Sequence, residues 1–145
     1  MFYLYLLPTL TLLIVALFLS PLRSKVWVAL ATAVTLALAA IVPAIGVLTS
    51  GKSLVLMEFM SPIFGQESLS IDPLSAIFLL IIGVAGVATV LYSKGYLEQY
   101  LKKKSSAHIS LHYTSLVVLI LSMMLVVISS GGFSFLFAWE LMTIA

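Results

Sequence analysis

The sequence contains no cysteine, only two histidines, and only seven basic and five acidic residues in 145. Without cysteine, this chain cannot form disulfides, use a thiolate nucleophile or ligate an iron–sulfur cluster. Two histidines are too few for most metal cages. No nucleophile–base pair and no phosphate-binding glycine loop occurs either, so we predict no catalytic, cofactor-binding or metal site. Any redox chemistry must therefore belong to a partner.

The scarcity of charge also excludes an ordinary soluble domain. Charged residues make up 8% of the chain and hydrophobic residues 63%, whereas a soluble domain is about one quarter charged and about half apolar. The net charge of +2 is too small for the basic face that nucleic-acid binding needs. The apolar content instead matches four to five bilayer-spanning helices of about 20 residues each.

Uncharged runs bounded by proline, glycine or charge predict an all-α integral membrane fold with four complete helices and the first half of a fifth. The predicted spans are about 2–20, 26–49, 74–93, 109–129 and, incomplete, 133–145. The first run is predicted to be a retained membrane helix and not a signal peptide, because the first charge, Arg23, follows it. Between the second and third spans, weak alternation in Ser53–Ile71 permits a small hairpin or a re-entrant segment at the membrane surface.

Basic residues in the short loops predict the orientation of the chain. Six of them lie in the first and third loops and one, Lys52, lies on the other side; the six are Arg23, Lys25, Lys94, Lys102, Lys103 and Lys104. By the positive-inside rule, loops 21–25 and 94–108 are cytoplasmic, whereas the N-terminus and loops 50–72 and 130–132 are external. The prediction is a multi-pass protein of the cell membrane.

One charge stands apart from these loops. Glu140 follows Phe133 by seven residues, which places it roughly 10 Å into a hydrocarbon core about 30 Å thick. Carboxylates at that depth usually mark an ion pathway, because an unpaired charge there is costly. The alternative is a neutral glutamic acid that forms a hydrogen bond across a helix interface.

Four other residues are candidates for a role. His108 and His112 share one face of the fourth span and could feed protons toward a channel, or they could be interfacial residues only. Ser122, inside the same span, could contribute to a polar path or to a helix interface. Asp72, followed by Pro73, is typical of a helix N-cap.

Small residues in the middle of the third span predict close helix neighbours. They are Gly83, Ala85, Gly86 and Ala88.

Four strings of residues occur in order at these membrane positions: Asp72-Pro73-Leu74-Ser75, Tyr92-Ser93-Lys94-Gly95-Tyr96, Ser122-Met123 and Trp139-Glu140-Leu141-Met142. Together they resemble the antiporter-like subunits of respiratory complex I. The Trp-Glu-Leu-Met string is most similar to the large membrane subunit of energy-converting hydrogenases and formate hydrogenlyase, the hydrogenase-4 component B type. The resemblance covers residues 1–145 and is strongest after Asp72.

This resemblance implies an ion-translocating subunit that has no redox centre of its own and works with other membrane subunits. In the family, the glutamate of the Trp-Glu motif handles protons within the membrane, a role that falls on Glu140. Family members have about fourteen membrane helices arranged in inverted repeats, with a buried lysine near that glutamate. This chain would correspond to the N-terminal portion only, and no such lysine is visible in it. Relatives also usually carry an Asp or Asn turn where this chain has Ser129-Ser130-Gly131-Gly132.

Two functional hypotheses follow. In the first, the chain translocates protons or sodium ions in a complex I-like or membrane-bound hydrogenase complex and couples redox energy to ion pumping. In the second, it is a structural scaffold that carries no ions, or a truncated fragment, because 13 residues after Gly132 form only about 20 Å of helix. The sequence does not distinguish protons from sodium, and it does not identify the electron donor or acceptor.

Overall fold

The computed structural model describes residues 11, 13–21, 24–61, 63–98 and 105–145. Its elements are four helices and two strands, preceded by a helical turn at 13–19. In chain order they are α2 (Lys25–Ser50), β1 (Leu54–Ser61), β2 (Gly65–Ile71), α3 (Pro73–Glu98), α4 (Ser106–Ile128) and α5 (Gly132–Ile144).

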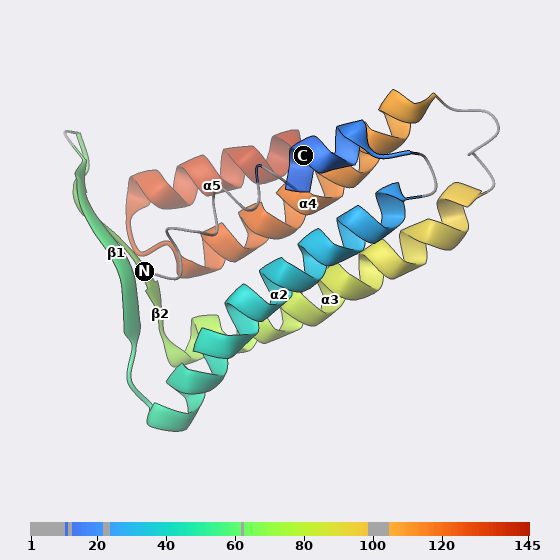
Figure 1. Cartoon of the computed structure of the whole chain (residues 1–145). Helices are drawn as coiled ribbons and strands as arrows, with labels where there is room; N and C mark the ends of the chain where they lie inside the picture. Colours follow the sequence, from blue (N-terminus) through green and yellow to red (C-terminus); the bar gives the residue numbers. More distant parts are fainter. Residues whose placement is uncertain (1–10, 12, 22–23, 62, 99–104) are drawn as a thin grey trace.

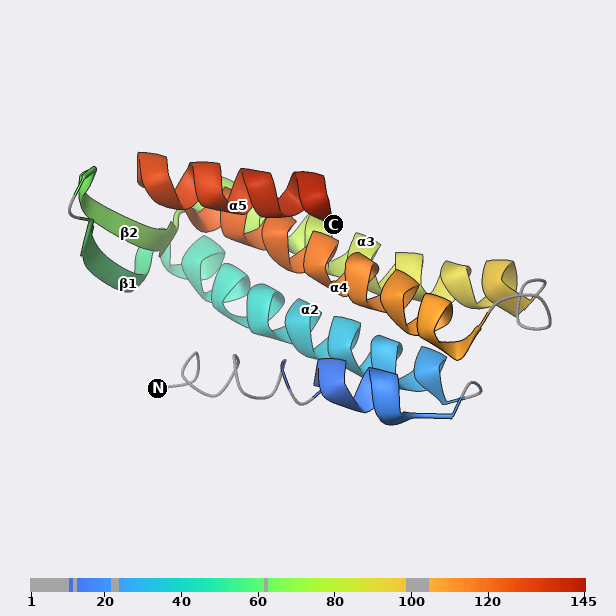
Figure 2. The same ribbon diagram turned by 90° about the horizontal axis from the view of Figure 1, so that it is seen from above.

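The long helices α2, α3 and α4 pack side by side and run antiparallel in chain order, and α5 folds back along α4 (Figures 1 and 2). The hairpin β1–β2 lies across one end of this bundle, next to the α4–α5 turn (Figure 1). The start of α2, the C-terminal end of α3 and the start of α4 lie at the opposite end of the bundle. The connections therefore separate into the two sets that the loop charges predict, while the side of the membrane that each set faces remains a prediction.

Among the described residues, three helices are long and apolar enough to cross a membrane: Lys25–Ser50, Pro73–Tyr96 and Ser106–Ile128. They correspond to the predicted spans 26–49, 74–93 and 109–129. The predicted first span lies largely outside the described residues, and α5 is a shorter apolar helix. Four complete spans and half of a fifth were expected, and three of the complete spans are thus confirmed.

The all-α prediction is wrong in one respect, because 54–71 forms a two-stranded antiparallel sheet. The register pairs Leu54 with Ile71 at the open end and Ser61 with Gly65 at the turn. Gly65 has a φ of 81°, a left-handed conformation that favours glycine. The weak alternation noted at this position therefore did indicate a hairpin.

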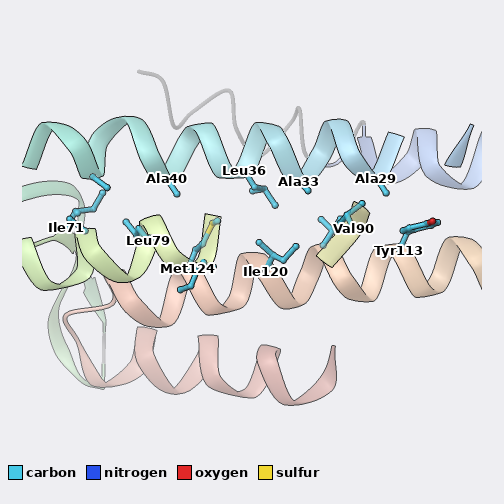
Figure 3. Close-up of a cluster of buried hydrophobic side chains, with 14 of the residues drawn as sticks. Ala29, Ala33, Leu36, Ala40, Ile71, Leu79, Val90, Tyr113, Ile120 and Met124 are labelled. Atoms are coloured by element: carbon cyan, nitrogen blue, oxygen red, sulfur yellow. The ribbon is translucent and has the colours of Figure 1, made fainter. Parts of the chain in front are cut away.

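Small and branched side chains fill the space between the three long helices (Figure 3). The α2 face is mainly alanine, including Ala29, Ala33 and Ala40, so that helix can approach α3 closely. From α3, a Cβ built on Gly83 would lie 3.2 Å from the Ile41 side chain, and one on Gly86 would lie 3.1 Å from Ile120. These two glycines are therefore at helix interfaces, as predicted.

The other two small residues of this set do not lie at a described helix interface. Ala85 and Ala88 are exposed on the outer face of α3.

Candidate functional site

Glu140 is in the third turn of α5, a helix with no other charged residue. Only Ala138 of this helix is buried, and the Glu140 side chain is exposed on the face that α4 does not cover. No described residue donates a hydrogen bond to its carboxylate. Its backbone carbonyl accepts one from the Thr143 hydroxyl at 2.8 Å. Glu140 thus presents a carboxylate on an otherwise apolar helical face, where another helix or lipid would meet it.

Ser122 lies near the same depth as Glu140 on the neighbouring helix. Helices α4 and α5 run antiparallel on either side of the turn that joins them. At 1.5 Å per residue, Ser122 lies about 9 Å from this turn along α4, and Glu140 lies about 12 Å from it along α5. Ser122 is fully buried, and its hydroxyl donates to the Leu119 carbonyl at 2.8 Å. It therefore faces the bundle interior whereas Glu140 faces outward.

The two histidines are near the opposite end of α4. By the same helical rise, even His112 is about 24 Å from the α4–α5 turn, about 12 Å beyond the level of Glu140. His108 is exposed, and its Nδ1 lies 2.7 Å from the Ser105 hydroxyl. His112 packs edge-on against Tyr113, and its buried Nε2 has no hydrogen-bond partner among the described residues. The fold does not bring either histidine next to Glu140.

Asp72 caps the N-terminus of α3. Its Oδ1 accepts a hydrogen bond from the Ser75 backbone N–H at 2.6 Å. Interactions with the Ser75 side chain and with its backbone N–H lower the pKa of Asp72 below its ordinary value. These contacts position the start of α3 next to the hairpin, and the Ser75 hydroxyl extends the connection by donating to the Val127 carbonyl of α4 at 2.9 Å.

Two of the described charged residues are buried in the structure, and one of them, Lys25, is among the basic loop residues that predict the orientation. Lys25 is fully buried at the start of α2. Its Nζ donates to the carbonyl oxygen of Leu17 at 2.7 Å and to Oγ of Ser110 at 2.5 Å. Lys25 thus links the helical turn at 13–19 to α4, with a cation placed where a helix C-terminus carries negative partial charge.

Glu67 in β2 is the second buried charge, with 2% of its surface exposed. Its Oε1 accepts a hydrogen bond from the Phe133 N–H at 3.1 Å. Its Oε2 accepts from the N–H of Ser134 at 3.1 Å and from the Ser134 hydroxyl at 2.8 Å. These bonds hold the pKa of Glu67 below its ordinary value, and the bond from the Ser134 N–H has the largest effect. The carboxylate therefore caps the first turn of α5.

One sequence signal could have identified Glu67. Side chains alternate between the two faces of a strand, so Glu67, Leu69 and Ile71 share one face. The alternation recognised at Leu69 and Ile71 extends back by one step to Glu67, which predicts that its side chain points inward. For Lys25, a basic residue directly before an apolar run gives no comparable signal, because snorkelling and buried lysines look alike in sequence.

Within the described residues, no group of three His, Asp or Glu side chains could hold a metal ion. Lys94 lies over the Trp27 ring, with Nζ 5.5 Å from the ring centroid. This cation–π contact ties the C-terminal part of α3 to the start of α2. It occurs at the end of the bundle opposite the hairpin.

Residues 66–105 match the family model described as NADH-ubiquinone oxidoreductase (complex I), chain 5 N-terminus. The matched segment runs from β2 through α3 to the start of α4, and it supports the antiporter-like complex I family for this chain. That family implies a multi-pass membrane protein with membrane-subunit partners in a multisubunit complex. Glu140 lies outside the matched segment. No curated protein matches the chain significantly.

Proposed function

We propose that this chain is an ion-translocating subunit of a complex I-like or membrane-bound hydrogenase complex, in which Glu140 carries the translocated proton or binds the sodium ion. The observation that carries this proposal is the exposed Glu140 carboxylate on the apolar helix α5. The match of residues 66–105 to the complex I chain 5 N-terminus supports the family in which such a carboxylate would work.

The chemistry follows from the surroundings of Glu140. A carboxylate in hydrocarbon is stable when it is protonated, paired or hydrated. A lysine on a helix that covers the exposed face of α5 would stabilise the ionised form and drive loss of the proton. Withdrawal of that cation would favour reprotonation. Redox energy released in a peripheral arm of the complex would drive this alternation, and the chain itself would need no redox centre.

The finer assignment is to the hydrogenase-4 component B and formate hydrogenlyase type, in the cell membrane. Trp139, Glu140 and the two residues after them support it, because this string is most similar to that branch. Residues 1–145 would then form the N-terminal part of an antiporter-like transmembrane domain. We also propose that the chain is oriented with loops 21–25 and 94–108 in the cytoplasm.

A proton route through α4 is the corresponding proposal for His108, His112 and Ser122. The Nε2 of His112, which has no hydrogen-bond partner among the described residues, supports it, because a buried imidazole nitrogen could exchange a proton with a neighbouring group. The estimated 12 Å between the levels of His112 and Glu140 requires further polar groups or water between them. Ser122, near the level of Glu140, would be one of these groups.

The experiment is ion transport by the complete complex in proteoliposomes, with the Glu140→Gln variant. We expect redox-driven transport to be lost while electron transfer continues. The matched control is Glu58→Gln, an exposed carboxylate in β1, which should leave transport unchanged. If E140Q transports ions at the wild-type rate, Glu140 is an interface acid and the chain is a structural scaffold.

A further inference from the structure

The hairpin and the helix that carries Glu140 are joined by more than the Glu67 carboxylate. The Ser130 N–H donates to the Ser68 carbonyl at 2.9 Å, and the Ser70 and Ser130 hydroxyl oxygens lie 2.6 Å apart. Leu69 and Ser129 form an antiparallel bridge. The α4–α5 turn therefore extends the hairpin as a short third segment of backbone pairing.

Gly131 allows Glu67 to enter this junction. A Cβ built on Gly131 would overlap the Glu67 carboxylate, including Oε2, Cδ and Oε1. The next residue, Gly132, has open space at the same position. The absence of a side chain at Gly131 is thus a steric requirement of the buried carboxylate.

The contacts of Glu67 are those of an ionised carboxylate. Each oxygen accepts a hydrogen bond from a backbone N–H, Oε1 from Phe133 and Oε2 from Ser134, and a backbone N–H can only donate. The first turn of a helix carries positive partial charge, which a carboxylate complements. At the hairpin end of the bundle, the other described titratable groups that carry charge are Glu58 in β1, Asp72 before α3 and Lys52 before β1, and all three are exposed.

We propose that Glu67 is a positioning residue for Glu140: it fixes the first turn of α5 against the hairpin and places a negative charge at the end of that helix. This inference rests on the proposed function of Glu140 as the ion carrier. Ser134 and Glu140 are six residues apart on α5, about 9 Å along the helix axis. A change at the hairpin therefore reaches Glu140 through one rigid helical segment.

The sign of the effect follows from charge. The Glu67 carboxylate disfavours a second negative charge on the same helix, because like charges repel. Removing the Glu67 charge should therefore make Glu140 easier to ionise. Residues that only stabilise the fold would change the unfolding temperature but not the protonation of Glu140.

The test is an infrared titration of the complete complex in lipid, in which the Glu140 carboxyl band is identified by its loss in E140Q. In Glu67→Gln we expect the titration midpoint of Glu140 to fall by roughly half a pH unit, the size of the repulsion between two like charges roughly 10 Å apart at a dielectric between those of protein and water. Glu67→Asp restores the carboxylate and should return the midpoint toward the wild-type value. Glu58→Gln is the matched control and should leave it unchanged.

A milder variant, Ser134→Ala, removes one donor to the carboxylate and keeps the charge, so it serves if E67Q fails to assemble. It should move the midpoint by less than E67Q. The proposal is overturned if the Glu140 midpoint is unchanged in folded E67Q, or if E67Q and E58Q shift it equally. If E67Q does not assemble, an unchanged Glu140 midpoint in S134A overturns it. The proposed function fails separately, if E140Q still transports ions although the midpoint responds to Glu67.

Discussion

Lys25 and Ser110 form a hydrogen bond across the bundle, with Nζ 2.5 Å from Oγ, although 85 residues separate them in the sequence. The Ser110 hydroxyl also lies 3.1 Å from the Leu17 carbonyl, which accepts from Lys25 as well. One lysine, one serine and one carbonyl thus connect the turn at 13–19, α2 and α4. No described carboxylate is paired with this buried cation, so hydrogen bonds from its ammonium group must offset its desolvation.

Replacing Lys25 by Met should therefore loosen the turn at 13–19. Methionine has a similar length but donates no hydrogen bond, so we expect a loss of about 1–3 kcal/mol in the free energy of unfolding, typical of hydrogen bonds to a charged group. Thermal unfolding of the purified chain in detergent measures this loss. Lys52→Met, at an exposed lysine, is the matched control. Equal unfolding temperatures for K25M and K52M would contradict a structural role for Lys25.

The Glu67 cap predicts a pH dependence of stability. The folded-state pKa of Glu67 is lowered from 4.5, so its contribution is complete above about pH 4.5 and is lost as the pH falls through the lower folded value. Wild type should therefore unfold at a higher temperature than Glu67→Gln at pH 7, and the two curves should converge in acid. Thermal unfolding between pH 7 and pH 3 tests this. Asp72, whose pKa is also lowered, adds the same pH dependence of stability to both proteins. A difference in unfolding temperature that stays constant at every pH would therefore contradict the prediction.

The positions of the long helices were predictable from the sequence because lipid-facing and core-facing helix surfaces are both apolar, so each span forms an uninterrupted run. Helix ends were less predictable, because hydropathy marks the membrane boundary and not the last hydrogen bond. The apolar run of the third span ends at residue 93, but the four-residue spacing of Tyr92, Tyr96 and Tyr100 predicts a helix that continues beyond it, and α3 does continue to Glu98. The polar residues after Ser93 leave the apolar region without ending the helix.

The sequence also could not separate the two kinds of small residue in α3. Gly83 and Gly86 face Ile41 and Ile120, whereas Ala85 and Ala88 are exposed. In a helix that is apolar on every side, no polar face indicates which residues point outward, so periodicity carries little information. The same reason explains why the outward direction of Glu140 required the structure.

The buried charges were missed because burial depends on partners from distant segments. Glu67 becomes a helix cap only when the α4–α5 turn, more than 60 residues later, is placed against β2. The burial of Lys25 and Glu67 was therefore not predictable from the pattern of loop charges. The grouping of loops at two ends of the bundle does not depend on Lys25, because Lys94 lies at the same end.

Two neighbouring glycines offer a matched test of the Glu67 junction. Gly131→Ala places a Cβ against the Glu67 carboxylate, whereas Gly132→Ala places one in open space. We expect G131A to lower the free energy of unfolding by about 1–3 kcal/mol, the usual cost of inserting a methyl group into a packed site. G132A should be neutral or slightly stabilising, since alanine favours the helix. Similar unfolding temperatures for the two variants would show that the carboxylate does not occupy this position.

The contact between the Ser70 and Ser130 hydroxyls predicts that the hairpin can be cross-linked to the α4–α5 turn. Because the chain has no native cysteine, the Ser70→Cys, Ser130→Cys double variant contains only the introduced pair. Its side-chain atoms replace oxygens that lie 2.6 Å apart, so mild oxidation should form an intramolecular disulfide. Thiol titration before and after oxidation measures its yield, and each single variant, which can only cross-link between molecules, is the control. Two thiols that remain free in the oxidised double variant would contradict the docking of β2 on the turn, and with it the route by which Glu67 reaches α5.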